Sequence, residues 1–165
     1  MSMSSVLVAV RGERCDDEVV RLGCELINSS KGKLYVLNVI EVERGFPEDA
    51  EIPPATAKAE EVLQRAERVV KSYKCSTEAY MRQTRRAGVA VVREAVDKEV
   101  DTIVLGVPYR ELYGSFTLGD TIPYVLKHAP CRVIIWRDPT LDASTKRPRD
   151  VNSPAAQHSA HNTGT

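Results

Sequence analysis

Short, mainly apolar runs separated by amphipathic segments dominate this sequence. The runs SVLVAV (5–10), DTIVLG (101–106) and CRVIIW (131–136) are rich in β-branched residues. The first two are typical of strands that are buried in a parallel sheet, and the third closes the pattern as the last strand. Two more segments, LYVLNVIEV (34–42) and CSTEAYMRQT (75–84), also read as strands. The second of these alternates polar with apolar residues, which indicates an edge position.

Between these strands, apolar residues recur at helical spacing in four segments. The predicted helices cover about 16–27, 55–73, 87–99 and 120–128, and the first begins with three acidic residues, which suit the positive end of a helix dipole. A regular alternation of strands and helices favours a doubly wound α/β fold. The sequence therefore predicts a five-stranded parallel sheet with helices on both faces.

The character of the chain changes near its end, so we predict two regions. Residues 1–138 form the ordered domain. Residues 139–165 are rich in Pro, Ser, Thr, Ala and Asn and contain few apolar residues. Such a segment cannot bury enough surface to offset the entropy of ordering, and we expect a disordered polar tail.

Composition excludes several classes of partner. Lys+Arg and Asp+Glu balance at 23 each, so no overall field favours nucleic acid or a membrane surface. The chain shows neither a transmembrane run nor a signal peptide, and we expect a cytoplasmic protein without a membrane partner. The four cysteines are widely scattered, which fits reduced structural thiols better than a zinc site or a disulfide framework.

The connection between the fourth strand and the fourth helix is unusually long. LGVPYRELYGSFTLGDT spans 105–121, whereas strand–helix connections in compact α/β domains usually take a few residues. Ligands of open parallel sheets bind beyond the carboxyl ends of the strands, where the strand order reverses. A helix N-terminus with free N–H groups and nearby glycines is a natural anion site. The long loop is therefore the candidate ligand-binding element.

The loop carries a motif that resembles the universal stress protein family. Its nucleotide-binding members have G-x2-G-x9-G-[S/T] at this place, often followed by a segment similar to YVLKHAPCRVIIW (124–136). Here the motif reads Gly106-Val-Pro-Tyr109, nine residues, Gly119-Asp120. The resemblance covers residues 5–137 and implies the strand order 3-2-1-4-5 of the adenine nucleotide alpha hydrolase-like fold. It also implies a homodimer and, in some members, binding of ATP or AMP.

Three positions depart from the motif. Tyr109 replaces the second glycine, Asp120 replaces the final Ser/Thr that helps to hold phosphate, and Arg11 stands where binding members usually show an aspartate. As an N-cap, Asp120 would accept hydrogen bonds from the first turn of the helix. A carboxylate there would also repel phosphate. We expect Tyr109 to fill the nucleotide crevice, with stacking on a base as the alternative.

The motif and the expected crevice together define the candidate ligand-contacting residues. Arg11 and Arg110 could attract an anion in a different geometry, although each could equally be a solvated loop residue. The full candidate set is Val10, Arg11, Gly12, Val39, Leu105, Gly106, Tyr109, Arg110, Gly119, Asp120 and Thr121.

The sequence leaves two functions open. One is a stress-response module whose ATP binding is weakened or lost; the other is an ATP- or AMP-binding protein with a modified phosphate loop. Neither a Ser-His-Asp constellation nor a metal-ligand cluster appears, so we expect no independent catalytic centre and no resident metal. We expect a homodimer through the last strand (131–136), because its apolar edge would otherwise be open to uncontrolled pairing.

Overall fold

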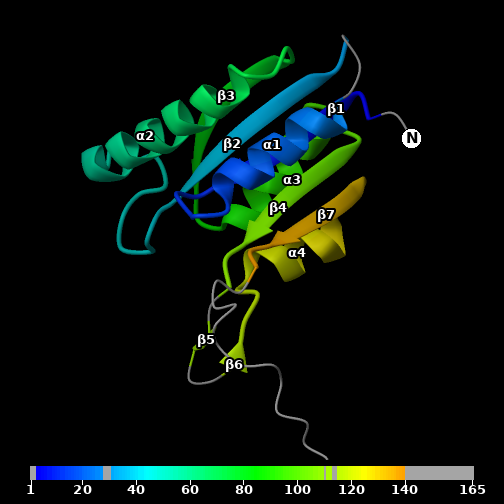
Figure 1. Ribbon diagram of the computed structural model, residues 1–165. Coiled ribbons are helices and arrows are strands. Elements are labelled where there is room, and N and C mark those ends of the chain that lie inside the picture. Colours follow the sequence, from blue (N-terminus) through cyan, green and yellow to red (C-terminus); the bar gives the residue numbers. More distant parts are fainter. Residues whose placement is uncertain (1–2, 28–30, 110, 113–114, 140–165) are drawn as a thin grey trace, which may run out of the picture.

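The computed structural model describes residues 3–27, 31–109, 111–112 and 115–139. They form an α/β domain whose central sheet lies between two pairs of helices (Figure 1). In chain order its elements are β1 (Ser5–Val10), α1 (Asp16–Leu26), β2 (Lys33–Glu41), α2 (Pro53–Val70), β3 (Ser76–Thr84), α3 (Ala87–Asp97), β4 (Thr102–Val107), β5 (Glu111–Leu112), β6 (Ser115–Phe116), α4 (Thr121–His128) and β7 (Arg132–Arg137).

The large sheet has the predicted topology. Its five strands are all parallel and lie in the order β3-β2-β1-β4-β7, which is the order 3-2-1-4-5 when only the strands of this sheet are counted. The first strand is central, with Val8 opposite Val36 of β2 on one side and Val104 of β4 on the other. The carboxyl ends of β1 and β4 are therefore neighbours, and the order of the strands reverses between them.

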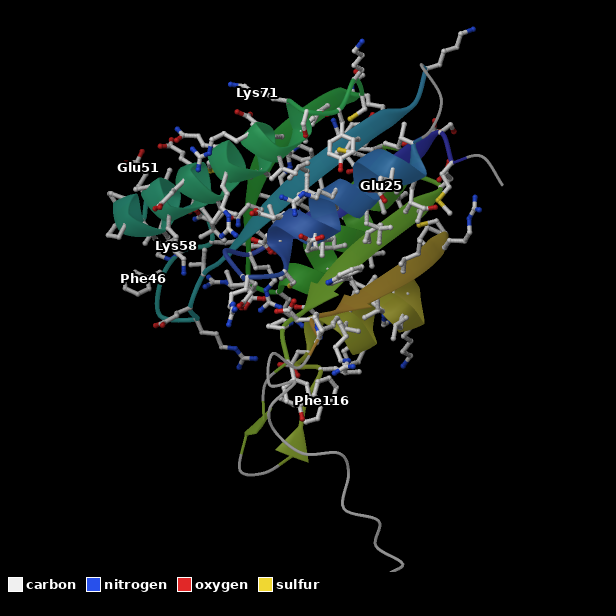
Figure 2. The ribbon with its side chains drawn as sticks, viewed as in Figure 1. Glu25, Phe46, Glu51, Lys58, Lys71 and Phe116 are labelled. Atoms are coloured by element: carbon white, nitrogen blue, oxygen red, sulfur yellow. The ribbon has the colours of Figure 1, made fainter. Side chains whose placement is uncertain are left out.

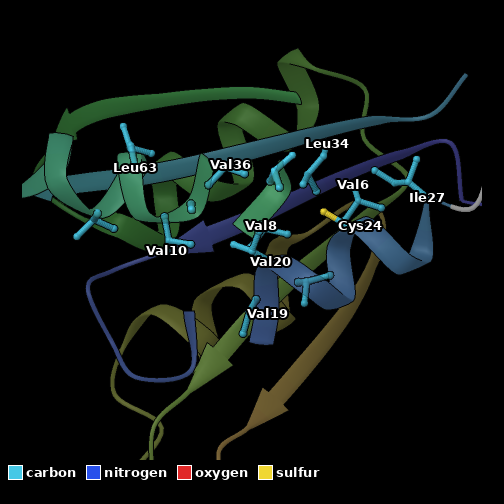
Figure 3. Close-up of a cluster of buried hydrophobic side chains, with 14 of the residues drawn as sticks. Val6, Val8, Val10, Val19, Val20, Cys24, Ile27, Leu34, Val36 and Leu63 are labelled. Carbon is cyan, nitrogen blue, oxygen red and sulfur yellow. The ribbon is translucent and has the colours of Figure 1, made fainter. Parts of the chain in front are cut away.

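The side chains of alternate residues of β1 pack into two separate hydrophobic cores. Val6 and Val8 pack with α1 and α2, whereas Leu7 packs with α3 and α4. Figure 1 shows the corresponding layers, with α1 and α2 on one face of the sheet and α3 and α4 on the other. Figure 3 shows the first core, in which β1 and β2 contribute valines and Leu34 against α1. Burial on both faces explains why the sequence of β1 is continuously apolar.

Some boundaries of the predicted elements differ from those in the structure. The second helix begins at Pro53, two residues before the expected start, because proline is tolerated in the first turn where its missing N–H leaves no bond unmade.

Within the long loop, β5 and β6 form a short antiparallel hairpin that sequence patterns did not indicate. Figure 2 shows Phe116 of this hairpin away from the sheet. Residues 140–165 of the predicted tail lie outside the described part of the chain.

None of the helices in the described segments combines the length and the apolar character needed to cross a bilayer.

The packing of α1 on the sheet depends on Gly23. A Cβ atom at this position would lie 2.7 Å from Val8 Cγ2 and 2.9 Å from Leu34 Cδ1. Both contacts are closer than carbon atoms tolerate, and both neighbours are fully buried. The helix can therefore approach β1 and β2 only because residue 23 has no side chain.

We predict that Gly23→Ala lowers the free energy of unfolding by about 1–3 kcal/mol, because overpacking outweighs the gain in helix propensity. Urea denaturation followed by circular dichroism measures this change. Gly45→Ala is the control, since a Cβ there meets nothing within 4 Å, and it should alter stability by less than about 0.5 kcal/mol. Equal stability of the two variants would contradict the packing account.

Candidate functional site

A cavity lies where the carboxyl ends of the central strands meet the N-termini of α3 and α4. Its volume is about 50 Å³. The lining residues come from β1 and the position after it, from β2 and β4, and from the first turns of the two helices: Ala9, Val10, Arg11, Leu37, Val39, Glu41, Ala87, Val91, Leu105, Gly106, Thr121 and Ile122. We call this space the switch-point cavity. It lies where a doubly wound sheet is expected to bind its ligand.

A second, more polar cavity adjoins the first. Its volume is about 130 Å³, and it shares Glu41, Ala87 and Thr121 with the switch-point cavity. The remaining lining residues are Arg85, Arg86, Gly88, Asp120 and Tyr124. Together the two cavities form a crevice that runs past the N-termini of α3 and α4, with an apolar end beside the sheet and a charged end outside it.

The buried carboxylate of Asp16 occupies the backbone donors of the loop after β1. Its Oδ2 atom accepts hydrogen bonds from the N–H groups of Gly12 at 2.7 Å and of Arg11 and Glu13 at 3.1 Å. Asp16 is only 7% exposed. Burial raises the pKa of this carboxyl group above its usual value, while the three N–H groups and the nearby Arg65 oppose the rise. The loop therefore binds an anion that belongs to the protein itself.

The N-terminus of α3 has a similar internal partner. The Ala87 N–H group donates to Glu41 Oε1 at 2.8 Å, so the last residue of β2 satisfies one of the free donors of the helix. Nearby, Arg85 donates through Nη1 to the Glu43 carbonyl at 2.5 Å, and the Arg86 guanidinium lies 5.1 Å from the centre of the Tyr124 ring. The charged end of the crevice therefore contains both signs.

Asp120 stands at the N-cap position of α4, as its sequence position predicted, but it does not act as predicted. Its side chain makes no capping hydrogen bond, and its backbone has helical angles (φ −96°, ψ −29°) rather than the extended angles of a usual N-cap. The carboxylate is exposed and borders the second cavity. The capping prediction was wrong, although the carboxylate does lie at the start of α4.

Tyr109 does not fill the switch-point cavity. Its ring is 41% exposed and lies outside the lining of both cavities. It stacks on Phe116 of the hairpin with ring centres 5.7 Å apart, and the Arg137 guanidinium lies 5.7 Å from its centre. The prediction that it fills the crevice was wrong, because the hairpin offers the ring an aromatic partner that the sequence pattern did not reveal.

Gly106 of the motif makes room for packing, and Gly12 and Gly119 have positive φ values. A Cβ at Gly106 would lie 2.8 Å from both Cys15 Sγ and Val19 Cγ2, so this glycine admits α1 against β4. Gly12 and Gly119 have φ values of 84° and 67°, a backbone region that other residues rarely adopt. The N–H group of Gly119 donates to Thr117 Oγ1 at 3.1 Å.

The structure thus brings together most of the predicted residues. Gly12, Tyr109 and Gly119 line neither cavity, and Arg110 lies outside the described residues. Asp120 lines the second cavity. Six predicted residues line the switch-point cavity: Val10, Arg11, Val39, Leu105, Gly106 and Thr121.

Sequence reasoning missed two charged residues. Glu41 could have been found as the residue that ends the second strand, on the same edge of the sheet as Arg11. Asp16 could have been found as the first acidic residue after a glycine-bearing loop. No group of three or more His, Cys, Asp or Glu side chains in the described part of the chain is arranged to hold a metal ion.

Comparison with known proteins places this geometry in context. The sequence profile of the universal stress protein family matches residues 3–137. The chain is also similar in structure to UspA from Lactobacillus plantarum (TM-score 0.65, 20% identity, 83% of this chain and 99% of the other). No curated protein matches the chain in sequence.

Two similar structures contain an adenine nucleotide. The universal stress protein of Archaeoglobus fulgidus in complex with dAMP superposes with a TM-score of 0.63 at 19% identity, over 82% of this chain and 98% of the other. An Arabidopsis thaliana member with AMP bound superposes with a TM-score of 0.58 at 19% identity, over 89% and 97% of the two chains. At these identities the likeness concerns the fold.

We predict that Asp16→Ala lowers the free energy of unfolding by about 2–4 kcal/mol, because it leaves the N–H groups at residues 11–13 without their acceptor in a part-buried loop. Chemical denaturation at neutral pH measures the change. Glu18→Ala is the control. Glu18 lies in the same helical turn, and its ion pair with Arg21 is exposed, so its removal should lower the free energy of unfolding by less than about 1 kcal/mol. If Asp16→Ala lowered the free energy of unfolding by as little as Glu18→Ala does, the carboxylate of Asp16 would be dispensable for stability.

Proposed function

Because the chain belongs to the universal stress protein family, we propose that it is a cytoplasmic stress-response module with weakened or lost ATP binding. In this proposal the crevice lies where a doubly wound sheet binds its ligand but binds phosphate poorly. The module acts as a homodimer through its shape and contacts, without a catalytic centre of its own.

The observation that carries the proposal is the set of carboxylates around the crevice. Asp16 occupies the donors after β1, Glu41 occupies a donor of α3, and Asp120 stands at the start of α4. A phosphate about 4 Å from one such charge is repelled by about 4 kcal/mol at an effective dielectric constant of about 20. That repulsion corresponds to nearly three decades of affinity at most.

The size of the crevice supports the same conclusion. The switch-point cavity holds about 50 Å³ and its neighbour about 130 Å³, whereas pockets for ligands of nucleotide size usually hold about 300–1,000 Å³. A nucleotide would therefore have to open the crevice before it could bind, and the free energy of opening would be taken from its affinity.

Binding of ATP or AMP through a modified phosphate loop is the second candidate. Adenine nucleotides are present in the similar structures from Archaeoglobus fulgidus and Arabidopsis thaliana. In this chain Arg11 borders the apolar cavity and Arg86 the polar one, and guanidinium groups bind phosphate well. An adenine ring in the apolar end with phosphates directed toward Arg86 would use both.

The exposed edge of the sheet supports the proposed homodimer. β7 pairs with β4 on one side only within the described chain. Its residues Val133, Ile134 and Ile135 are partly exposed, and an apolar edge of this kind invites pairing with another strand. Pairing with the same edge of a second copy about a twofold axis would cover both.

We predict that the purified full chain releases little adenine nucleotide on acid extraction, and that 1 mM ATP raises its melting temperature by less than about 1 °C. We further expect Asp120→Ser to increase ATP affinity by about tenfold or more, because it removes the negative charge beside the start of α4. Isothermal titration calorimetry measures that change.

Asp97→Ser provides the matched control. It removes the same charge from an exposed position at the other end of α3, so it should leave ATP affinity unchanged. One nucleotide per chain in the extract of the unaltered protein would refute the weakened-site proposal and support the second candidate. Equal affinities of the two variants would remove Asp120 from the explanation.

We predict that light scattering at micromolar protein concentration gives twice the 18.3 kDa mass of one chain. Placing a proline at Ile134, in the middle of β7, interrupts the edge and should shift the mass toward that of one chain. Circular dichroism controls for folding of the variant. A monomeric mass of the unaltered protein across the whole concentration range would overturn the dimer.

A further inference from the structure

Two cysteines that are far apart in the sequence meet in the first core. Cys24 lies in the second half of α1, and Cys75 precedes β3 by one residue. Their sulfur atoms are 3.6 Å apart, although the residues are separated by 51 positions. Figure 3 shows Cys24 among the buried side chains of Val6 and Ile27. We infer that Cys24 and Cys75 are an oxidation site at which a peroxide produces a reversible intramolecular disulfide.

The distance between the two sulfur atoms suits this reaction. A disulfide bond is about 2.05 Å long, so the sulfur atoms must approach by about 1.6 Å, which is within the reach of small side-chain rotations. The other two cysteines, Cys15 and Cys131, make no sulfur–sulfur contact with any thiol of the described chain. The geometry therefore selects one pair out of four cysteines.

The two thiols differ in exposure, and this difference divides their roles. Cys75 is partly exposed, whereas Cys24 is only 5% exposed. Burial and the contact with Cys75 raise the pKa of the Cys24 thiol to about 12, with a smaller contribution from Glu25. Cys24 is thus protonated and shielded, so an oxidant from solvent meets Cys75 first. The Thr77 hydroxyl lies 3.6 Å from Cys75 Sγ and donates a hydrogen bond to the Cys75 carbonyl oxygen at 3.4 Å.

The chemistry balances with hydrogen peroxide as the oxidant. The thiolate of Cys75 attacks one peroxide oxygen, the O–O bond breaks, and a sulfenic acid forms while hydroxide leaves and takes up a proton. The sulfur of Cys24 then attacks the sulfur of Cys75 and displaces hydroxide, which accepts the Cys24 proton and departs as water. Two thiols lose two electrons and two protons in all, and one peroxide becomes two molecules of water.

The bond would join two layers of the molecule. α1 belongs to the helical layer and β3 is an edge strand of the sheet. Closing a loop of 51 positions restricts the unfolded chain strongly, so the oxidised protein should be more stable than the reduced one. We expect the melting temperature to rise by about 5–15 °C.

The test uses the reduced full chain treated with a few equivalents of hydrogen peroxide. After alkylation in denaturant, the mass of the untreated chain should show four alkyl groups, one on each cysteine, and that of the treated chain only two. Peptide mapping should find Cys24 joined to Cys75, and a phosphine reductant should restore both thiols. Treatment in urea should slow the pairing at least tenfold, because the folded structure holds the thiols together.

Variants at three cysteines complete the test. Cys75→Ser and Cys24→Ala should each abolish the cross-link and the rise in melting temperature. Cys131→Ser, which alters another partly exposed thiol, should retain both. Oxidation of Cys75 to a sulfinic acid while Cys24 stays alkylatable would overturn the inference. A mapped cross-link that involves Cys15, Cys131 or a second chain would do the same, and the mapping of the unaltered chain decides this even where a variant fails to fold.

Discussion

Parallel pairing of β1 with β4 is the constraint on which the rest of this structure depends. Val8 lies opposite Val104, and the register continues to Ala9 opposite Leu105. This pairing ends both strands at the same edge of the sheet and sends their following segments to opposite faces, one into α1 and the other toward α4. The crevice is a consequence of that divergence. A strand order that separated β1 from β4 would remove the crevice and the reason to regard the long loop as a ligand-binding element.

The fold was predictable because burial on two faces leaves a clear mark in the sequence. In β1, the valines at positions 6, 8 and 10 face α1 and α2 while Leu7 faces α3 and α4, so the run from Val6 to Val10 is continuously apolar. Edge strand β3 is only partly buried along its length, and polar residues flank its apolar centre. The order of the strands could not be predicted in the same way. It came from the resemblance to a family, because periodicity alone does not say which strands are neighbours.

The candidate site was only partly predictable because its key contacts depend on atoms that are distant in sequence. Glu41 reaches Ala87 across 46 positions, and no local pattern announces that contact. Tyr109 stacks on Phe116 of a hairpin whose sequence does not show a strong strand pattern. Gly106 appeared to be a phosphate-contacting glycine, yet its missing side chain makes room for Cys15 and Val19. A motif glycine can thus be required by packing, independently of any ligand.

Helix α1 connects the two unusual features of the molecule. Its first residue, Asp16, occupies the loop donors beside the crevice; near its other end, Gly23 allows contact with the sheet and Cys24 meets Cys75. The helix is therefore held to the sheet at both ends, by hydrogen bonds to backbone at one and by close packing at the other. A cross-link at Cys24 would act on an element that already sits firmly, so it would add stability without needing to rearrange the crevice. The proposed oxidation site and the crevice can consequently be altered independently, although one helix contributes to both.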